Sequence, residues 1–473
     1  MAFDKFSEIA IENHGKKLEG KCLKDLGIEN KSKKNDKGGF NKIVESEYFK
    51  IDNNNLQIAD FWEAGIELKI TPLRRIKPIK ASEFIRQQKG FSVKERTVLT
   101  MIDYHKLATE TWENNSLSKK AFKILFGFYI WEKDVSNLEY IFDLVSLWEP
   151  SKQDLEIIRN DWEFIVKKVK DGRAHEISEG DTLYLGACTK GETAKSTRKQ
   201  PFSEIQAKQR AFSFKRFYMD SVYEELLQKQ KRNTTSIKKE NKTLEESLKE
   251  LFENYLGKTA YDIEKSFDLN FENYNKLPKS YYADLSNKIL GTDSVENIEE
   301  FNKAGIFLKT IRVKKDGTPV ESIPLPIFKF KELIEESIWE ESQLYSVLTS
   351  QKFLFVIYEI QKDKKIEFDK LSDLDKRKFL KLKKVKLWNI SESGLEEMEK
   401  VWEETKKVIN NGVKIVTKNG KDFNDFPGLK FNGVGHVRPH AKDKQDTYPL
   451  PDGNKMTKQC FWLNANYIKD ELK

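Results

Sequence analysis

The chain of 473 residues is long enough for about two or three ordinary domains, and with 38% hydrophobic and 12% aromatic residues it can bury a core in each. Charged residues make up 34% of the chain and the net charge is only +8, so both signs are mixed; a pI of about 8.9 suits a nucleic-acid partner without requiring one. Three widely separated cysteines argue against a disulfide framework or zinc ribbon, no run approaches the roughly 20 apolar residues of a membrane helix, and we expect a cytoplasmic protein.

The elements expected in the first half alternate between helices and strands. Residues 1–17 predict an amphipathic helix and lack the apolar centre of a signal peptide. Apolar–polar alternation and two buried-type runs predict strands at 65–73, 95–104 and 123–131. In the first of these, Ile66, Leu68 and Ile70 share one face. An amphipathic helix is expected from residue 152 to Gly172, so the class is mixed α/β.

The sequence also resembles itself. Residues 60–69 read DFWEAGIELK and residues 300–309 read EFNKAGIFLK, while LEIIRNDWE at 155–163 corresponds to LEEMEKVWE at 395–403. A glycine follows the tryptophan at the same interval in both copies, at Gly172 and Gly412. This period far exceeds the roughly 20–50 residues of stacked repeats. We therefore expect two related domains in tandem, at 1–223 and 251–473.

The join between the copies is expected at residues 224–250, EELLQKQKRNTTSIKKENKTLEESLKE. This stretch is polar and charge-rich, with few large apolar residues, as expected for a solvated linker that is either a helix or a loop. The alternative is a surface helix within one large domain.

A candidate catalytic set lies in the first copy of the repeated motif. Asp60, Glu67 and Lys69 have the spacing D-x6-E-x-K, and on a strand Glu67 and Lys69 point to the same side. A bend just before the strand would bring the Asp60 carboxylate beside Glu67. Two carboxylates, phosphate oxygens and water are ligands that Mg²⁺ prefers, and bound Mg²⁺ activates water and neutralises charge on phosphate. A lysine can hold or polarise the attacking water, so the segment predicts magnesium-dependent hydrolysis of DNA.

A plainer interpretation is the solvated face of an edge strand, because Glu-x-Lys is frequent in a chain rich in both residues. The second copy favours the catalytic interpretation. It has Glu300 at the aspartate position and Phe307 at the glutamate position, while Lys309 is retained. This pattern is typical of an enzyme domain with a degenerate partner.

Longer segments are similar to a known family. DFWEAGIELKITPL, LEIIRNDWE, HEISEGDTLYLGACTKG and QPFSEIQAKQRAFSFKRFYM resemble the MutH-type nucleases, and within them the staphylococcal-type restriction endonucleases that cut at GATC. HVRPH (436–440) and MTKQCFWLNANYIK (456–469) resemble the C-terminal half of such enzymes, so the similarity covers both copies. The resemblance implies two tandem PD-(D/E)xK domains, the second a pseudo-nuclease, Mg²⁺ dependence, and cleavage before the G of GATC with a 5′ phosphate. It further implies that the second copy binds another GATC site as an effector.

The resemblance also assigns roles in the cutting centre. In the D-x6-E-x-K set, the two carboxylates would hold the metal and the lysine would be catalytic. Lys94, in KERTVL, matches a further lysine near the scissile phosphate. A helix glutamate upstream of the aspartate matches Glu45, with Glu47 as the alternative.

The same resemblance gives candidate DNA contacts in both copies. They are Lys190, Ser213 and Lys215 in the first copy and Arg438 and His440 in the second. The first copy has Ala187 where the mismatch-repair relatives have an arginine shortly before that lysine, whereas the second copy keeps an arginine in Arg-Pro-His.

The sequence therefore predicts a type II restriction endonuclease that binds double-stranded DNA at two GATC sites per chain. A transient dimer on DNA and a cognate methyltransferase are the expected partners. The alternatives are a nicking endonuclease of mismatch repair, which would resemble one copy only, and a non-catalytic GATC-binding protein. The chain has no GxxxxGK phosphate loop, which argues against ATP-driven cleavage or translocation.

Overall fold

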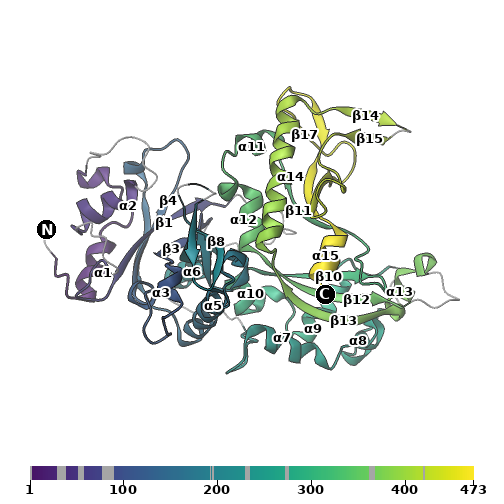
Figure 1. Ribbon diagram of the computed structural model, residues 1–473, viewed down its shortest axis with the longest axis horizontal. Helices are drawn as coiled ribbons and strands as arrows, with labels where there is room; N and C mark the ends of the chain where they lie inside the picture. Colours follow the sequence, from purple (N-terminus) through teal and green to yellow (C-terminus); the bar gives the residue numbers. More distant parts are fainter. Residues whose placement is uncertain are drawn as a thin grey trace. The chain divides into compact units, whose positions relative to one another are not determined.

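The computed structural model describes residues 3–28, 39–51, 58–76, 90–191, 193, 196–228, 235–271, 276–361, 368–418 and 421–473, with the elements shown in Figure 1. The chain divides into two compact units. Unit 1 comprises Met1–Thr234 with Asn302–Ala304, and unit 2 comprises Thr235–Phe301 with Gly305–Lys473. Within the described ranges, no helix has the length and apolar character needed to cross a membrane.

Unit 1 is built from two sheets and the helices around them. Its helices are α1 (Glu8–Lys16), α2 (Gly39–Ile43), α3 (Tyr104–Leu107), α4 (Ser118–Ala121), α5 (Lys152–Lys170) and α6 (Arg216–Gln228), with the short turns η1 (Lys24–Leu26), η2 (Val44–Tyr48), η3 (Asn137–Glu139), η4 (Ala174–Glu176) and η5 (Glu179–Asp181). Its strands are β1 (Glu67–Arg75), β2 (Phe91–Val93), β3 (Thr97–Met101), β4 (Ile124–Ile130), β5 (Phe142–Trp148), β6 (Leu185–Thr189), β7 (Thr197–Gln200), β8 (Ser203–Lys208) and β9 (Arg210–Phe214).

The larger sheet of unit 1 has the strand order β2-β1-β4-β5, with β1 and β4 parallel and the other pairs antiparallel. A second, antiparallel sheet has the order β3-β9-β6, and β7 and β8 form a hairpin. The expected strands at 95–104 and 123–131 are confirmed as β3 and β4. The expected long helix is confirmed as α5, which begins after the N-cap Ser151 and ends just before Gly172.

Strand β1 confirms the strand expected at 65–73, shifted two residues along the chain, and it is internal to its sheet. Leu68 and Ile70 lie in the core with Phe49, Phe61 and neighbouring apolar side chains. The opposite face of β1 is buried as well, since Glu67 is only 2% exposed. The interpretation as a solvated edge strand is therefore wrong, because β1 has a strand on each side and a carboxylate turned inward.

Unit 2 has a similar set of elements. Its helices are α7 (Leu244–Glu253), α8 (Ala260–Ser266), α9 (Tyr281–Ile289), α10 (Glu299–Ala304, whose last residues fall in unit 1), α11 (Phe330–Glu335), α12 (Gln343–Ser350), α13 (Asp373–Lys376), α14 (Glu392–Asn411) and α15 (Ala465–Glu471), with the turns η6 (Val295–Asn297), η7 (Trp339–Glu341), η8 (Phe368–Lys370) and η9 (Arg377–Phe379). Its strands are β10 (Ile306–Val313), β11 (Ile323–Phe328), β12 (Lys352–Ile360), β13 (Leu380–Trp388), β14 (Ile415–Lys418), β15 (Lys421–Asn424), β16 (Gly435–Pro439), β17 (Thr447–Pro449), β18 (Lys455–Thr457) and β19 (Gln459–Leu463).

The two units repeat one strand topology. In unit 2, β10 is parallel to β12 and β12 is antiparallel to β13, as β1, β4 and β5 are in unit 1. The antiparallel sheet β11-β19-β16 repeats β3-β9-β6, and α14 follows β13 as α5 follows β5. Unit 2 adds the β14–β15 hairpin between α14 and β16. The mixed α/β class is confirmed, and the repeated motifs in the sequence fall on equivalent elements.

The segment expected to be a polar linker, 224–250, differs from that expectation. Helix α6 extends to Gln228, and α7 begins at Leu244 behind a capping box of Thr243 and Glu246. Leu244 and Leu248, one turn apart, are each only 2% exposed, so α7 packs on unit 2. Helix α7 belongs to unit 2 because two apolar residues at helical spacing bury one face of an otherwise charged segment. The boundary between the two units accordingly lies before α7, at Thr234.

Candidate active site

A tight loop brings Asp60 back to the start of β1. Phe61 N donates to Ile66 O at 2.9 Å and Ile66 N donates to Phe61 O at 3.1 Å, which closes the loop at both ends. Gly65, at φ +67°, makes the turn with a backbone conformation that glycine adopts without strain. The Asp60 Oδ2 atom accepts a hydrogen bond from Leu68 N at 2.9 Å. The bend that the spacing required is therefore present.

Glu67 is the most buried member of the set. Its Oε1 atom lies 2.7 Å from Lys69 Nζ and 3.6 Å from Lys120 Nζ. Its Oε2 atom is buried and has no hydrogen-bond partner in the structure. Burial, together with the Asp60 carboxylate, raises the pKa of Glu67, and the two lysines oppose this rise. The carboxylate thus keeps one oxygen for a ligand of positive charge.

Glu45, not Glu47, faces this cluster. Burial, repulsion by Asp60 and, less strongly, repulsion by Glu67 raise the pKa of Glu45 to about 7. Glu47, two residues further along η2, is exposed and lies 3.7 Å from Lys50. η2 is a π-helical turn, in which Phe49 N donates to Val44 O at 3.1 Å, and such turns frequently occur at functional sites.

The turn that carries Glu45 is held from the N-terminal helix. Tyr48 Oη donates to His14 O at 2.8 Å, and the Tyr48 ring stacks on the His14 ring with centroids 4.7 Å apart. The Phe3 ring also stacks on the His14 ring, with centroids 4.0 Å apart. Burial lowers the pKa of His14, which keeps this layer of rings neutral.

The carboxylates fit a hard divalent cation. Burial is the main cause of the raised pKa values of Glu45 and Glu67, and repulsion between neighbouring carboxylates adds to it; a cation placed between the carboxylates relieves both. In the described part of the chain, no three His, Cys, Asp or Glu side chains form a ready-made metal cluster. A site of one or two carboxylates, completed by water and substrate oxygens, is the arrangement usual for Mg²⁺. The donors at Asp60 and Glu67 match that requirement.

The second lysine beside Glu67 is Lys120, not Lys94. Strand β4 pairs with β1 at Glu67↔Ile124, so α4, just before β4, lies at the Glu67 end of β1. Lys94 lies further along the sheet, where its N atom donates to Pro72 O at 2.8 Å. Five residues of strand separate Pro72 from Glu67, about 17 Å. The Lys94 ammonium sits 4.3 Å above the Trp131 ring.

The candidate DNA contacts of unit 1 fall into two groups. Lys190 is exposed directly after β6. Ser213 and Lys215 are buried, at 0% and 3% exposure, so their side chains lie inside unit 1 instead of on its surface. Lys215 Nζ donates to Thr182 O at 2.5 Å, and burial lowers the pKa of Lys215.

Lys215 belongs to a buried arrangement that fixes the start of β6. Asp161, on α5, accepts hydrogen bonds from the backbone N atoms of Leu183, Tyr184 and Leu185 at 2.8, 2.7 and 2.9 Å. This function of Asp161 was not anticipated from the sequence. The repeat aligns Asp161 of the first copy with Val401 of the second, and this difference between the copies could have indicated a special role for Asp161.

In unit 2 the residues at the positions of Asp60 and Glu67 make different contacts. Glu300 is 1% exposed and accepts hydrogen bonds from Ser236 Oγ and from the N atoms of Ile237 and Lys238, both at 3.2 Å. Phe307 packs against the unit 2 core, and burial lowers the pKa of Lys309. This strand start therefore offers no pair of carboxylates to a metal.

Arg438 and His440 lie at the open edge of unit 2, since β16 is the last strand of its sheet and both side chains are exposed. The Arg438 guanidinium stacks 3.7 Å from the centroid of the Trp462 ring, and the His440 ring contacts the same indole edge-on at 5.1 Å. Arg438 and His440 thus both pack on the ring of Trp462.

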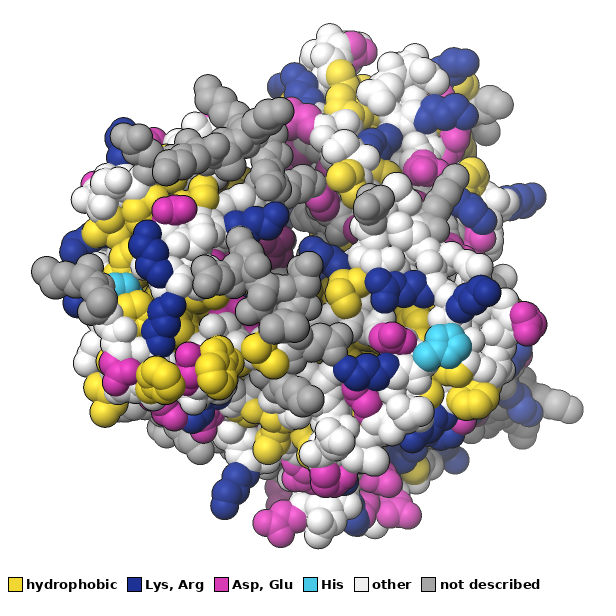
Figure 2. All heavy atoms as spheres, turned by 60° about the vertical axis from the view of Figure 1, so that its left-hand side comes forward, with side chains coloured by type: hydrophobic (Ala, Val, Ile, Leu, Met, Phe, Trp, Pro, Cys, Tyr) yellow, Lys and Arg dark blue, Asp and Glu magenta, His cyan; other side chains and the backbone are white. Residues whose placement is uncertain are grey.

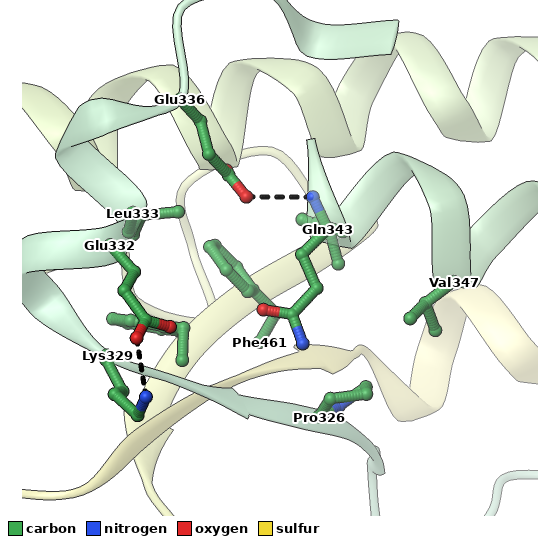
Figure 3. Close-up of a pocket in the computed structure, with 10 residues that line it drawn as sticks. Pro326, Lys329, Glu332, Leu333, Glu336, Gln343, Val347 and Phe461 are labelled. Carbon is green, nitrogen blue, oxygen red and sulfur yellow. Dashed lines mark hydrogen bonds and ion pairs between the residues drawn. The ribbon is translucent and has the colours of Figure 1, made fainter. Parts of the chain in front are cut away.

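A shallow pocket in unit 2 contains none of these residues (Figure 3). It lies between β11, α11, α12 and β19, and Glu336 accepts a hydrogen bond from Gln343 N across its rim. On the face drawn in Figure 2, lysines and arginines are interspersed with aspartates and glutamates. The candidate site is therefore defined by the carboxylate–lysine cluster and not by the pocket or by a uniformly basic surface.

Comparisons with known proteins find two kinds of relative. Residues 49–161 match the family model of the DNA mismatch repair enzyme MutH. The chain is 30% identical over 505 aligned residues to the type II restriction enzyme Sau3AI of Staphylococcus aureus, covering 98% of both proteins. It is 26% identical to the mismatch repair protein MutH of Shewanella amazonensis over 155 residues, which are 32% of this chain and 62% of that protein. The MutH protein of Shewanella woodyi gives 26% identity over 32% of this chain.

The matched region contains β1 with Asp60, Glu67 and Lys69, and the α/β arrangement around it is that of PD-(D/E)xK-type nucleases. Mismatch-repair relatives align with about a third of the chain, whereas the restriction enzyme aligns across both units. The chain therefore belongs to the MutH-type nuclease family, and it is similar to a type II restriction enzyme over its whole length.

Proposed function

We propose that the protein is a type II restriction endonuclease that hydrolyses double-stranded DNA at GATC, cutting before the G to leave 5′ phosphates. The observation that carries this proposal is the buried Glu67 carboxylate, held by two lysines beside Asp60 and Glu45, in a chain aligned end to end with a restriction enzyme. A mismatch-repair nickase is the second candidate, because the MutH family model covers the same site.

The residues divide the chemistry among them. Asp60 and Glu67 would hold Mg²⁺, which when bound supplies an activated water and neutralises charge on the phosphate. Lys69 donates a hydrogen bond to Glu67 Oε1 and Lys120 forms an ion pair with the same atom, and both ammonium groups would stabilise negative charge that grows on the phosphate during attack. Glu45 adds a third carboxylate that balances the cationic charge. Glu67 itself is buried, and the lower dielectric around it strengthens its interaction with the two lysines.

Unit 2 would bind a second GATC site and stimulate cutting by unit 1. Its strand start lacks the carboxylate pair, yet it keeps Arg438 and His440 exposed on a sheet edge. GATC is palindromic and each chain carries one complete cutting centre, so a double-strand break needs two chains meeting on DNA or two successive nicks. Protection of the host genome would require a cognate methyltransferase.

The assignment of Glu45 is tested by a matched pair of variants. Glu45→Gln should lower the single-turnover cleavage rate of a GATC duplex by about a hundredfold or more, because it removes a charge from the metal-binding cluster. Glu47→Gln, two residues away on the exposed side of the same turn, should leave the rate within about threefold of wild type, as expected for a surface change. Equal losses in the two variants would contradict the assignment.

A second pair separates the two lysines. We expect Lys120→Met to slow cleavage by about a hundredfold or more, the size of loss seen when one donor to a developing oxyanion is removed. Lys94→Met should retain the wild-type rate within a few-fold, since Lys94 lies on Trp131. Rates are measured under single turnover with saturating Mg²⁺. The reverse order would restore the role that the family resemblance gave to Lys94.

The effector role predicts a dependence on the number of sites. A plasmid with two GATC sites should be cut faster than one with a single site, because binding at one site raises the local concentration of the other. Added short GATC duplex should accelerate cutting of the one-site plasmid, and Arg438→Ala should abolish this acceleration while leaving slow basal cleavage. A one-site rate that matches the two-site rate and ignores added duplex would show that unit 2 is no effector, and nicking of one strand only would favour the mismatch-repair candidate.

A further inference from the structure

Trp62 is exposed immediately beside the carboxylate cluster. Its side chain is 64% exposed, although burying an indole is among the larger favourable contributions available to a side chain. Within the described ranges, the indole has no stacking, hydrogen-bond or ion-pair partner. An exposed tryptophan is informative when its backbone is fixed and its neighbourhood is functional, and both conditions hold here.

The loop presents the indole rigidly. Phe61, the preceding residue, is fully buried, and its ring packs edge-on against Phe49 at 5.8 Å and Phe3 at 6.2 Å. Residues 61 and 66 exchange two backbone hydrogen bonds, and Gly65 N donates to Trp62 O at 3.3 Å. Because Phe61 points into the core, the next side chain along the loop points outward and little conformational entropy is left to lose on contact with a ligand.

The indole is also within reach of the DNA that the cluster would cut. Trp62 is two residues from Asp60, so their Cα atoms are at most about 7 Å apart. Successive nucleotides of one strand rise by about 3.4 Å along the duplex axis. A strand whose phosphate lies at Asp60 and Glu67 therefore places a neighbouring sugar and base within the span of the indole.

The second copy of the motif supplies an internal comparison. Aligning DFWEAGIELK with EFNKAGIFLK pairs Phe61 with Phe301, which is 2% exposed, and Trp62 with Asn302, which is 7% exposed. The inward phenylalanine is common to both copies. The exposed tryptophan occurs only in the copy that keeps the carboxylate pair, so it accompanies the cutting centre and not the shared scaffold.

We propose that Trp62 packs against the nucleotide next to the scissile phosphate on the strand that is cut. The flat apolar face of the indole covers the sugar of that nucleotide and the face of its base, which partly unstacks from the duplex on binding, and its Nε1–H is a hydrogen-bond donor. Such a contact tolerates any base and so positions the strand without reading it. This inference rests on the proposed function, because it assumes that DNA is the substrate held at Asp60 and Glu67.

The test uses the full-length protein and a GATC duplex with 2-aminopurine next to the cut position. Trp62→Ala should weaken binding in Ca²⁺ by about tenfold, in keeping with the loss of one aromatic contact to a base, and should abolish the change in 2-aminopurine fluorescence on binding. Trp62→Phe should retain part of both. Ile9→Ala, on α1, removes another exposed apolar side chain (72% exposed) and should alter neither. All variants should keep the wild-type unfolding temperature, because both side chains are exposed.

Wild-type affinity and an unchanged 2-aminopurine response in Trp62→Ala would overturn the inference. So would a variant that binds DNA normally but loses self-association, since the indole would then contact a second copy of the chain. Failure of the proposed function is recognised separately, as failure of the wild-type protein to cut GATC at all with Mg²⁺.

Discussion

The proposed cutting centre depends on one buried carboxylate. Glu67 opens strand β1 and is only 2% exposed, and the ammonium groups of Lys69 and Lys120 offset part of the cost of burying its carboxylate. The parallel pairing of β1 with β4 delivers Lys120 to this point, and the closed loop before β1 delivers Asp60. Removing Lys120 would weaken the support of this buried charge, whereas removing Asp60 would take away a neighbouring carboxylate that raises the pKa of Glu67. Fold and site are therefore coupled through the same few contacts.

Unit 2 has the same strand order as unit 1 but lacks a glutamate at the position of Glu67. Phe307 replaces the buried glutamate with an apolar side chain, and Glu300 binds backbone and hydroxyl groups of residues 236–238. A similar exchange occurs on the long helix, where the fully buried Val401 of α14 stands in place of Asp161 of α5. Charged interactions of unit 1 have apolar counterparts in unit 2, although the strand order is the same. The shared strand topology thus does not require the acidic residues Glu67 and Asp161 of unit 1.

Much of the site could be predicted from the sequence because it is local. Alternation over a few residues and a glycine turn fix the Asp60–Lys69 arrangement. What failed depends on long-range structure: Lys120 reaches the site through strand pairing, and a π-helical turn decides which of two neighbouring glutamates faces inward. The burial of Lys215 was equally hidden, because lysine is rarely buried and its partners come from a different part of the chain. The burial of one face of α7 was not predicted, because its two leucines lie within a charged run.

The central claim is that one cutting centre per chain, built on the buried Glu67, performs the hydrolysis. The most direct test is full-length Glu67→Gln, which keeps the size of the side chain and removes its charge, incubated with supercoiled GATC plasmid and either Mg²⁺ or Mn²⁺. We predict no nicked or linear product with either metal, together with wild-type affinity for a GATC duplex in Ca²⁺. Nicked or linear plasmid formed at the wild-type rate would contradict the account, because it would place the cutting centre elsewhere in the chain.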